Sequence, residues 1–189
     1  MSKRIFALLV VFILMNLGQS CKPEHWLIVD INFNAASILE NNQDKEHIKF
    51  SRTSSIKDKL IFIVSYETEY MYGYISNFGN VCYATTKGNV SDNELLRNTF
   101  SLTFDKEFTY NGNSIPAMTD IFQIETITKE MDVYKCYYTY PLGFLVINFS
   151  DKFFKNSVFN TTEEYIVTFS CETSDKKFFE KTIMIKFEK

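Results

Sequence analysis

Apolar and polar residues alternate with a period of two in several separate segments, as they do in strands that bury one face. The clearest case is the C-terminal stretch, where one face carries Tyr165, Val167, Phe169 and Cys171. After a turn over residues 173–177, the alternation resumes through Ile183, Ile185 and Phe187. The pattern predicts an antiparallel hairpin at the end of the chain.

Further strands are expected throughout the chain. They are residues 27–33, with Leu27, Val29, Ile31 and Phe33 on the apolar face, the aromatic stretch 60–74, and runs at 81–85, 100–105, 133–140 and 145–149. Thr119-Asp120 predicts the cap of a short helix, residues 91–94 fit a capping box before a helical turn at Leu95-Leu96, and the polar segment 41–59 predicts a long loop. The fold class is therefore mainly β, an antiparallel β-sandwich (immunoglobulin-like or similar) with one or two short helices.

The first twenty residues indicate export. A basic opening, Met1-Ser2-Lys3-Arg4, precedes the uncharged apolar run from Ile5 to Met15, and small and polar residues at 16–20 end that run. This order is typical of a secretory signal peptide. The run is shorter than the roughly 20 residues that cross a bilayer. Residues 1–20 are therefore predicted to be a cleaved signal peptide.

Cys21 stands where such a signal would be cleaved. The preceding Leu17-Gly18-Gln19-Ser20 resembles a bacterial lipobox, in which the cysteine receives a diacylglycerol and becomes the mature N-terminus. We therefore expect residues 21–26 to be a lipidated cysteine and tether, and residues 27–189 to be a single β domain held at the outer membrane. The alternative is ordinary cleavage near Ser20, with Cys21 in a disulfide.

The order of several segments carries a family resemblance. These segments are Cys21, residues 82–85, residues 100–105 followed by Phe108, residues 119–122, residues 145–149 and the hairpin from Tyr165 to Phe187. Together they resemble a family of lipoproteins of unknown function from Bacteroidetes-type bacteria. That family usually has a glycine in the final hairpin turn and often a proline after the strand near Phe149, and this chain has neither. The resemblance implies attachment to the cell envelope and brings no known activity.

Charge narrows the classes of partner. Of the 20 basic residues, Lys3 and Arg4 belong to the signal, which leaves 18 against 23 acidic residues and a net charge of about −5. Nucleic acids select basic surfaces, so no nucleic-acid partner is expected. The expected partners are a membrane, through the N-terminal lipid, and a carbohydrate or protein ligand that the sequence does not identify.

The sequence offers little catalytic or metal-binding chemistry. The two histidines, His25 and His47, fall in the tether and in a polar segment. Neither suits a base for a cysteine nucleophile, and their separation does not match zinc-ligand spacing. Glu67 and Glu69 would stand about 7 Å apart on one strand face, which suits acid–base chemistry, but solvated strand acids are far more common. We expect no enzymatic activity, no cofactor and no metal.

A cluster of tyrosines is the most distinctive candidate for binding. Tyr66, Tyr70, Tyr72 and Tyr74 share one strand parity, which continues from Phe62 and Val64. Exposed rings on a sheet stack on sugars or peptides. Tyr70, Tyr72 and Tyr74 are therefore candidate binding residues. The competing interpretation is that this parity faces the core, and Glu67 and Glu69 on the opposite parity favour it.

Two functional interpretations follow. The first is an exported, lipid-anchored cell-envelope protein that serves as a binding or structural module without catalysis. The second is a secreted glycoprotein of eukaryotic type with two disulfides and glycosylation sequons at Asn89, Asn148 and Asn160. If Cys21 carries lipid, only Cys82, Cys136 and Cys171 remain, so at most one internal pair forms. A buried free thiol is the simpler interpretation of Cys171.

Overall fold

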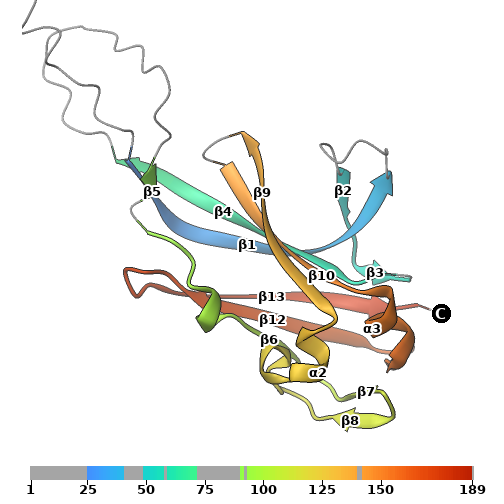
Figure 1. The fold of residues 1–189 in the computed structure, drawn as a ribbon. Coiled ribbons are helices and arrows are strands. Elements are labelled where there is room, and N and C mark those ends of the chain that lie inside the picture. Colours follow the sequence, from blue (N-terminus) through green and yellow to red (C-terminus); the bar gives the residue numbers. More distant parts are fainter. Residues whose placement is uncertain are drawn as a thin grey trace, which may run out of the picture.

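Two mostly antiparallel sheets pack face to face (Figure 1). The computed structural model describes residues 25–40, 49–57, 59–71, 90–91, 93–139 and 142–188. The larger sheet, sheet A, has the strand order β2-β1-β4-β10-β9, and β5 pairs beside β1. Its strands are β1 (His25–Glu40), β2 (Lys49–Arg52), β4 (Ile61–Met71), β5 (Val90–Ser91), β9 (Met131–Thr139) and β10 (Leu142–Phe149).

The second sheet, sheet B, is built around the predicted C-terminal hairpin and has the order β3-β13-β12-β6. Its strands are β3 (Ser55–Ile56), β6 (Ser101–Phe104), β12 (Glu164–Glu172) and β13 (Phe178–Phe187). A small sheet of β11 (Ser157–Val158), β7 (Phe108–Tyr110) and β8 (Asn113–Ile115) lies near one end. The described residues also form two short α-helices, α2 (Glu125–Thr128) and α3 (Asp151–Asn156). The predicted β-sandwich with short helices is confirmed.

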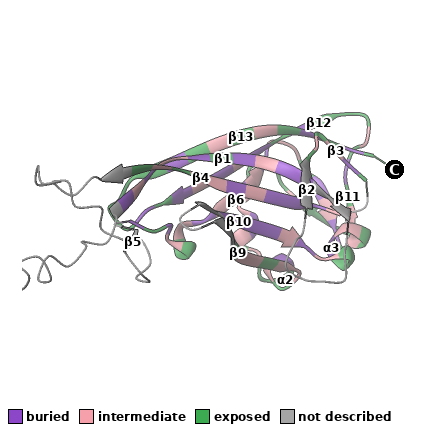
Figure 2. Ribbon diagram, turned by 90° about the horizontal axis from the view of Figure 1, so that it is seen from above, coloured by how far each residue is buried: buried purple, intermediate pink, exposed green. Residues whose placement is uncertain are grey.

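The hydrophobic core lies between the sheets. The four inward residues of β12 are each no more than 1% exposed. Phe169 in sheet B stacks on Phe33 in β1, with ring centroids 5.6 Å apart, and Phe33 also packs against Phe62 in β4 at 5.1 Å. Figure 2 shows the buried positions running along the strands of both sheets. Since each large apolar side chain contributes about 1.5–3 kcal/mol when buried, these rows hold the two sheets together.

A cluster of aromatic rings seals the end of the sandwich where β13 finishes. Its closest pair is Phe159 and Phe187, whose rings stack with centroids 3.7 Å apart. The small sheet and α3 add Phe108 and Phe153 to this cluster. Ser150 caps α3 by accepting a hydrogen bond from the Phe153 N–H at 3.1 Å. The aromatic richness of the sequence therefore serves largely to close one end of the core.

The strand β1 departs from the predicted alternation. Trp26 and Ile28 are buried, whereas Leu27 and Val29, which were expected on the apolar face, are only half-buried. The register between β1 and β4 shifts at Val29, which is an extra residue opposite β4 and hence a β-bulge. A bulge exchanges the two faces of a strand. The expected faces of Ile31 and Phe33 are therefore correct, and those of Leu27 and Val29 are wrong.

The local helix signals had mixed outcomes. The Asp120 side chain accepts a hydrogen bond from the Phe122 N–H at 3.0 Å and caps a 3₁₀ turn, η2 (Ile121–Gln123), close to the expected position. The turn expected at Leu95-Leu96 is wrong, because Leu95 forms a β-bridge with Thr173 and the 3₁₀ turn η1 covers Arg97–Thr99. The expectation of a loop over residues 41–59 is wrong in part, because residues 49–52 and 55–56 form strands. The strand expected at 81–85 lies outside the described residues.

Asn93 fastens the bulge of β1 to the hairpin turn of sheet B. Its side-chain Oδ1 accepts from the Ile28 N–H at 2.8 Å, and its Nδ2 donates to the Ile28 carbonyl at 3.2 Å. The same Nδ2 donates to the Asp175 carboxylate at 3.3 Å. The amide therefore completes the backbone of β1 much as a neighbouring strand would.

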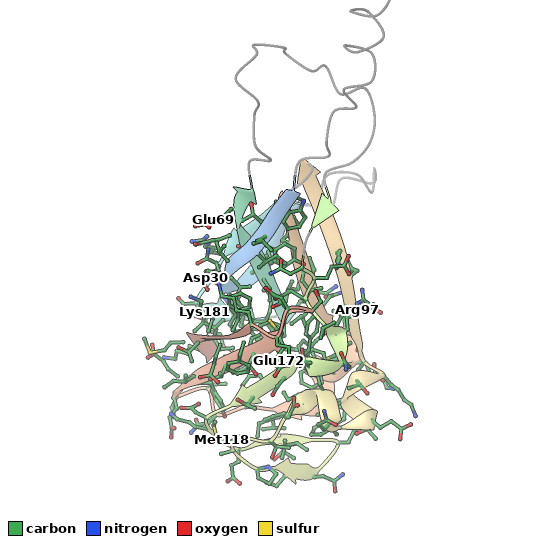
Figure 3. All side chains as sticks on the ribbon, turned by 90° about the vertical axis from the view of Figure 1, so that its left-hand side faces the viewer. Asp30, Glu69, Arg97, Met118, Glu172 and Lys181 are labelled. Atoms are coloured by element: carbon green, nitrogen blue, oxygen red, sulfur yellow. The ribbon has the colours of Figure 1, made fainter. Side chains whose placement is uncertain are left out.

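Lys177, in the turn between β12 and β13, and Lys181, in β13, complete this connection. The Lys177 ammonium donates to the carbonyl of Val29, the bulged residue. Lys181 Nζ lies 2.7 Å from Asp30 Oδ2, and these two side chains meet at the side of the molecule seen in Figure 3. The other oxygen of Asp30 accepts from the Ile31 N–H at 2.8 Å. Side chains thus join the β1 and β13 edges of the sandwich.

Replacing Asn93 with alanine should lower the free energy of unfolding by roughly 2–4 kcal/mol, because it leaves the N–H and carbonyl of Ile28 without partners in a buried place. Urea denaturation monitored by circular dichroism measures this change. The matched control is Asn113→Ala, because Asn113 is exposed and donates only a long bond of 3.5 Å to Asn111. The control should change stability by less than about 0.5 kcal/mol. Equal losses in both variants would contradict the role of Asn93.

The contact between Asp30 and Lys181 should make stability depend on acidity. The hydrogen bond from Lys181, and then that from Ile31, hold the pKa of Asp30 below its ordinary value. A lowered folded-state pKa gives stability that is present above the unfolded pKa, about 3.9, and is lost as the pH falls through the folded value. Wild type should exceed Lys181→Met in stability at pH 6, by at most about 1 kcal/mol because both side chains are solvated, and the gap should close below pH 3.

Urea denaturation at pH 2.5, 4 and 6 measures this gap. The control is Lys155→Met, since Lys155 forms no ion pair among the described residues. A gap for Lys181→Met that is constant over this pH range would rule out the ion pair as its cause.

Candidate functional site

A hollow of about 570 Å³ opens on the outer face of sheet B. It lies where β12 begins and β13 ends. Its lining comes from the residues just after β6, from the turn before β12 and from the two hairpin strands. It consists of Asp105, Lys106, Thr162, Glu163, Glu164, Ile166, Met184 and Lys186. Ligand sites commonly occupy about 300–1,000 Å³. Its volume falls in this range, but it is a shallow depression that is wide open to solvent, so it suits a few side chains on a partner's surface.

The floor of the hollow is apolar. Ile166 in β12 and Met184 in β13 stand directly opposite each other in the register. Their chain neighbours Tyr165 and Ile185 point into the core, so Ile166 and Met184 point outward and are 43% and 64% exposed. Folding does not require apolar side chains at these positions. The apolar character of this pair is therefore the feature of the hollow that most favours a binding role.

The rim of the hollow is charged and held in place by hydrogen bonds. Lys106 Nζ lies 2.6 Å from Glu163 Oε2, and this contact holds the pKa of Lys106 above its ordinary value. The other oxygen of Glu163 accepts from Asn160 Nδ2 at 2.9 Å. Asn160 Oδ1 in turn accepts from the N–H of Thr162 at 3.0 Å. The turn from Asn160 to Glu163 thus presents the rim in a fixed conformation.

Asp105 ties this rim to the sheet. Its carboxylate accepts from the Ile166 N–H at 2.8 Å, and its own N–H donates to the Ile166 carbonyl at 3.0 Å. Beyond the floor, Glu164 and Lys186 stand opposite each other in the register. An apolar floor between charges of both signs can recognise an amphipathic group without covalent chemistry. No set of three metal-ligating side chains occurs in the part of the chain that the structure describes.

The candidate residues from the sequence lie elsewhere. Cys21, Tyr72 and Tyr74 are outside the described residues. Tyr70 lies in β4, opposite Trp26 of β1 and at the same strand parity as Tyr66. Phe62, Val64 and Tyr66, which share this parity, pack against the main core. Over residues 62–66 this is therefore the inner face of sheet A, as the competing interpretation expects.

Glu67 and Glu69 lie on the outer face of β4, and both are exposed. Asn32 Nδ2 donates to Glu67 Oε1 at 2.7 Å, so this carboxylate already has a neighbour across the strands. His25 begins β1, and His47 lies outside the described residues. Neither the two glutamates nor the two histidines line the hollow.

Cys171 is a free cysteine with no exposed surface. Burial raises the pKa of its thiol to about 12. Since the thiolate is the reactive form of cysteine, this side chain acts as a small apolar residue of the core.

Comparisons of the chain with protein-family models, with curated proteins and with solved structures find no match. Among the described residues, no helix is long and apolar enough to span a membrane.

Cys171 should resist alkylation in the folded protein. A pKa of about 12 instead of 9.0 leaves about a thousandfold less thiolate at pH 8, and burial slows the reaction further. Iodoacetamide at pH 8, followed by peptide mass spectrometry, should modify Cys171 only after urea is added. Ser170→Cys is the matched control, because residue 170 is next in the strand on the outer face. Equal rates at positions 170 and 171 in the native protein would refute the assignment.

Proposed function

We propose that this chain is an exported protein, lipid-anchored to the outer membrane through Cys21, that acts by non-covalent recognition at the end of its sandwich farther from the anchor. The N-terminal signal pattern and the lipobox-like residues 17–20 support the export and the anchor. The hollow on sheet B supports recognition. The main structural support is that the start of β1 and the hollow lie at opposite ends of the molecule.

The order of contacts along β1 fixes these two ends. Ile28 lies near the turn of the β12–β13 hairpin, because Asn93 bonds to both Ile28 and Asp175. The other end of the sandwich is marked by Ala35, whose carbonyl accepts from the N–H of Thr53 at 3.1 Å, and by Lys186, whose N–H donates to the Ser54 carbonyl at 2.7 Å. Lys186 also lines the hollow. At about 3.3 Å a residue, the two ends are roughly 25 Å apart.

An anchor at residue 21 would therefore hold the start of β1 close to the membrane. Figure 1 shows the chain entering β1 on the left and β13 ending on the right. With only a few residues between Cys21 and His25, the hollow would face away from the lipid surface. A partner in the surrounding compartment would reach it without approaching the bilayer.

The competing interpretation, a secreted glycoprotein with two disulfides, has less support. Two disulfides require all four cysteines, and Cys171 is free and buried. Of its sequons, Asn148 lies within β10 with a buried side-chain oxygen, and Asn89 is outside the described residues. Asn160 is exposed, but its amide is already bonded within the rim of the hollow.

Labelling with a clickable fatty acid in a Gram-negative host tests the anchor. Wild-type protein should carry the label and sediment with membranes, because each methylene of an acyl chain that enters the bilayer contributes about 0.8 kcal/mol to membrane binding. Cys21→Ser should abolish the label. Cys171→Ala is the matched control, since it also removes one thiol, leaves an apolar side chain in the core and should keep the label.

Unlabelled, soluble wild-type protein would overturn the proposal. A disulfide-linked peptide containing Cys21, found by mass spectrometry, would identify the secreted alternative instead.

A further inference from the structure

The strand β9 forms one end of sheet A, and among the described strands it pairs only with β10. The N–H of Phe149 donates to Leu60, next to β4, and the N–H of Ser150 donates to Glu130, next to β9. Backbone groups alternate in direction along a strand. The residues of β10 that bond to β9 are therefore Asn148 and Val146, whose partners are Asp132 and Tyr134.

Val133 and Lys135 alternate with these residues along β9, so their backbone groups point away from β10. The N–H and carbonyl groups of Val133 and Lys135 point out of the sheet, along its open edge. No bond to these groups from the described residues closes that edge. The helix α2 contacts the beginning of β9.

The edges of β1 and β6, in contrast, are closed by side chains or loops. On β1, Asn93 covers Ile28 and Lys177 covers Val29. On β6, the Asp120 carboxylate accepts from the Leu102 N–H at 3.0 Å, and the N–H of Met118 donates to the Phe104 carbonyl at 2.7 Å. Folded proteins commonly protect such edges because unpaired backbone groups accept additional strands. Among the described residues, no side chain or loop bonds to the outward groups of β9, and the charge of Lys135 is the protection that this edge carries.

We propose that β9 receives an extended segment of another polypeptide as an additional antiparallel strand of sheet A. Main-chain hydrogen bonds supply the affinity in this mode of recognition, and side chains at alternate positions supply the specificity. The surface is distinct from the hollow. The proposal does not depend on the lipid anchor.

The side chains of β9 define the chemistry of that segment. On the inner parity, Met131 and Val133 pack against the main core, whereas Lys135 is exposed. On the outer parity, Asp132 is exposed and Tyr134 packs against the second apolar cluster, on the other face of sheet A. A complementary strand therefore carries an acid opposite Lys135 and a base opposite Asp132. Opposite the packed residues it carries apolar side chains, and these residues are Met131, Val133 and Tyr134.

Lys135 also favours a different polypeptide over a second copy of this chain. When a strand pairs antiparallel with its own copy, residues of equal parity stand opposite each other. Asp132 is the only acid in β9, and it has the opposite parity to Lys135. Self-pairing therefore never places a carboxylate of β9 opposite Lys135, whose charge would face either an uncharged side chain or the same lysine of the other copy. Such a charge acts against wrong partners and selects an acidic one.

A designed peptide can test the edge directly. The probe is a fluorescent peptide of sequence Thr-Glu-Tyr-Val-Lys-Ile-Thr, which runs antiparallel to β9 with its Glu opposite Lys135. Fluorescence anisotropy should show saturable binding to the purified protein. Lys135→Pro should weaken binding at least tenfold, because proline removes the outward N–H, and edge strands tolerate proline at such positions. Lys135→Ala keeps that N–H and should weaken binding less than Lys135→Pro.

Charge exchange tests the specificity. A second peptide with Lys in place of its Glu should bind wild type about threefold to tenfold more weakly, and Lys135→Glu should reverse this preference. Amide hydrogen exchange gives an independent readout. The first peptide should slow exchange at Val133 and Lys135 and leave Asp132 and Tyr134 unchanged, because the latter two already bond to β10.

Three results would overturn the proposal. The first is the absence of saturable binding to wild type. The second is unchanged binding by both Lys135→Pro and Val133→Pro, each checked for a native circular dichroism spectrum; testing two positions guards against misfolding of either variant. The third is a wild-type dimer in sedimentation that Lys135→Pro dissociates, which would assign the edge to a second copy.

Discussion

Packing of aromatic side chains between the two sheets is the interaction on which the rest of this structure depends. Phe33, Phe62 and Phe169 join the sheets through direct ring contacts. A second group of rings, with Phe159 stacked on Phe187, closes the end of the core. Once these faces are buried, the direction of every residue in the paired strands is set, because each strand alternates between core and solvent. The hollow and the open edge are consequences of that arrangement.

Packing two sheets face to face does not by itself give hydrogen-bond partners to the backbone groups along their edges. The bulge at Val29 lets β1 keep Trp26 and Ile28 in the core on one side of it and Ile31 and Phe33 on the other. It also disturbs the backbone groups at the edge of β1. Asn93 and Lys177 compensate by bonding to those groups from other parts of the chain. The joint between β1 and β13 is thus made by side chains, in a place where a closed barrel would use a backbone ladder.

Much of the fold was predictable from the sequence, because the period of two is strong where one strand face is buried. The hairpin from Tyr165 to Phe187 and the cap at Asp120 are confirmed. The bulge at Val29 was not predictable, since a single extra residue leaves the composition of the segment unchanged. At Asn93 a sequence suited to a helix cap instead serves a tertiary contact with Ile28, a residue distant in sequence. Local propensity cannot anticipate such a contact.

The hollow was harder to predict than the fold for a related reason. Period-two alternation identifies which positions face outward, but it does not say which outward positions from different strands become neighbours. Ile166 and Met184 are apolar residues on the outward parity of the hairpin, and only the register between β12 and β13 places them together. The rim also needs Lys106, which follows β6 and lies 57 residues from its partner Glu163 in the sequence.

Outward positions are also where function and stability are most easily separated. The inner residues of β12 are fixed by the core, so changing them alters the fold and any function at once. Ile166 and Met184 contribute little to burial, and the backbone groups of Val133 and Lys135 make no contact that the sheet requires. Substitutions at these places leave the aromatic core intact. A loss of recognition there therefore reports on the surface itself, which makes the outer face of sheet B and the β9 edge the informative places to examine.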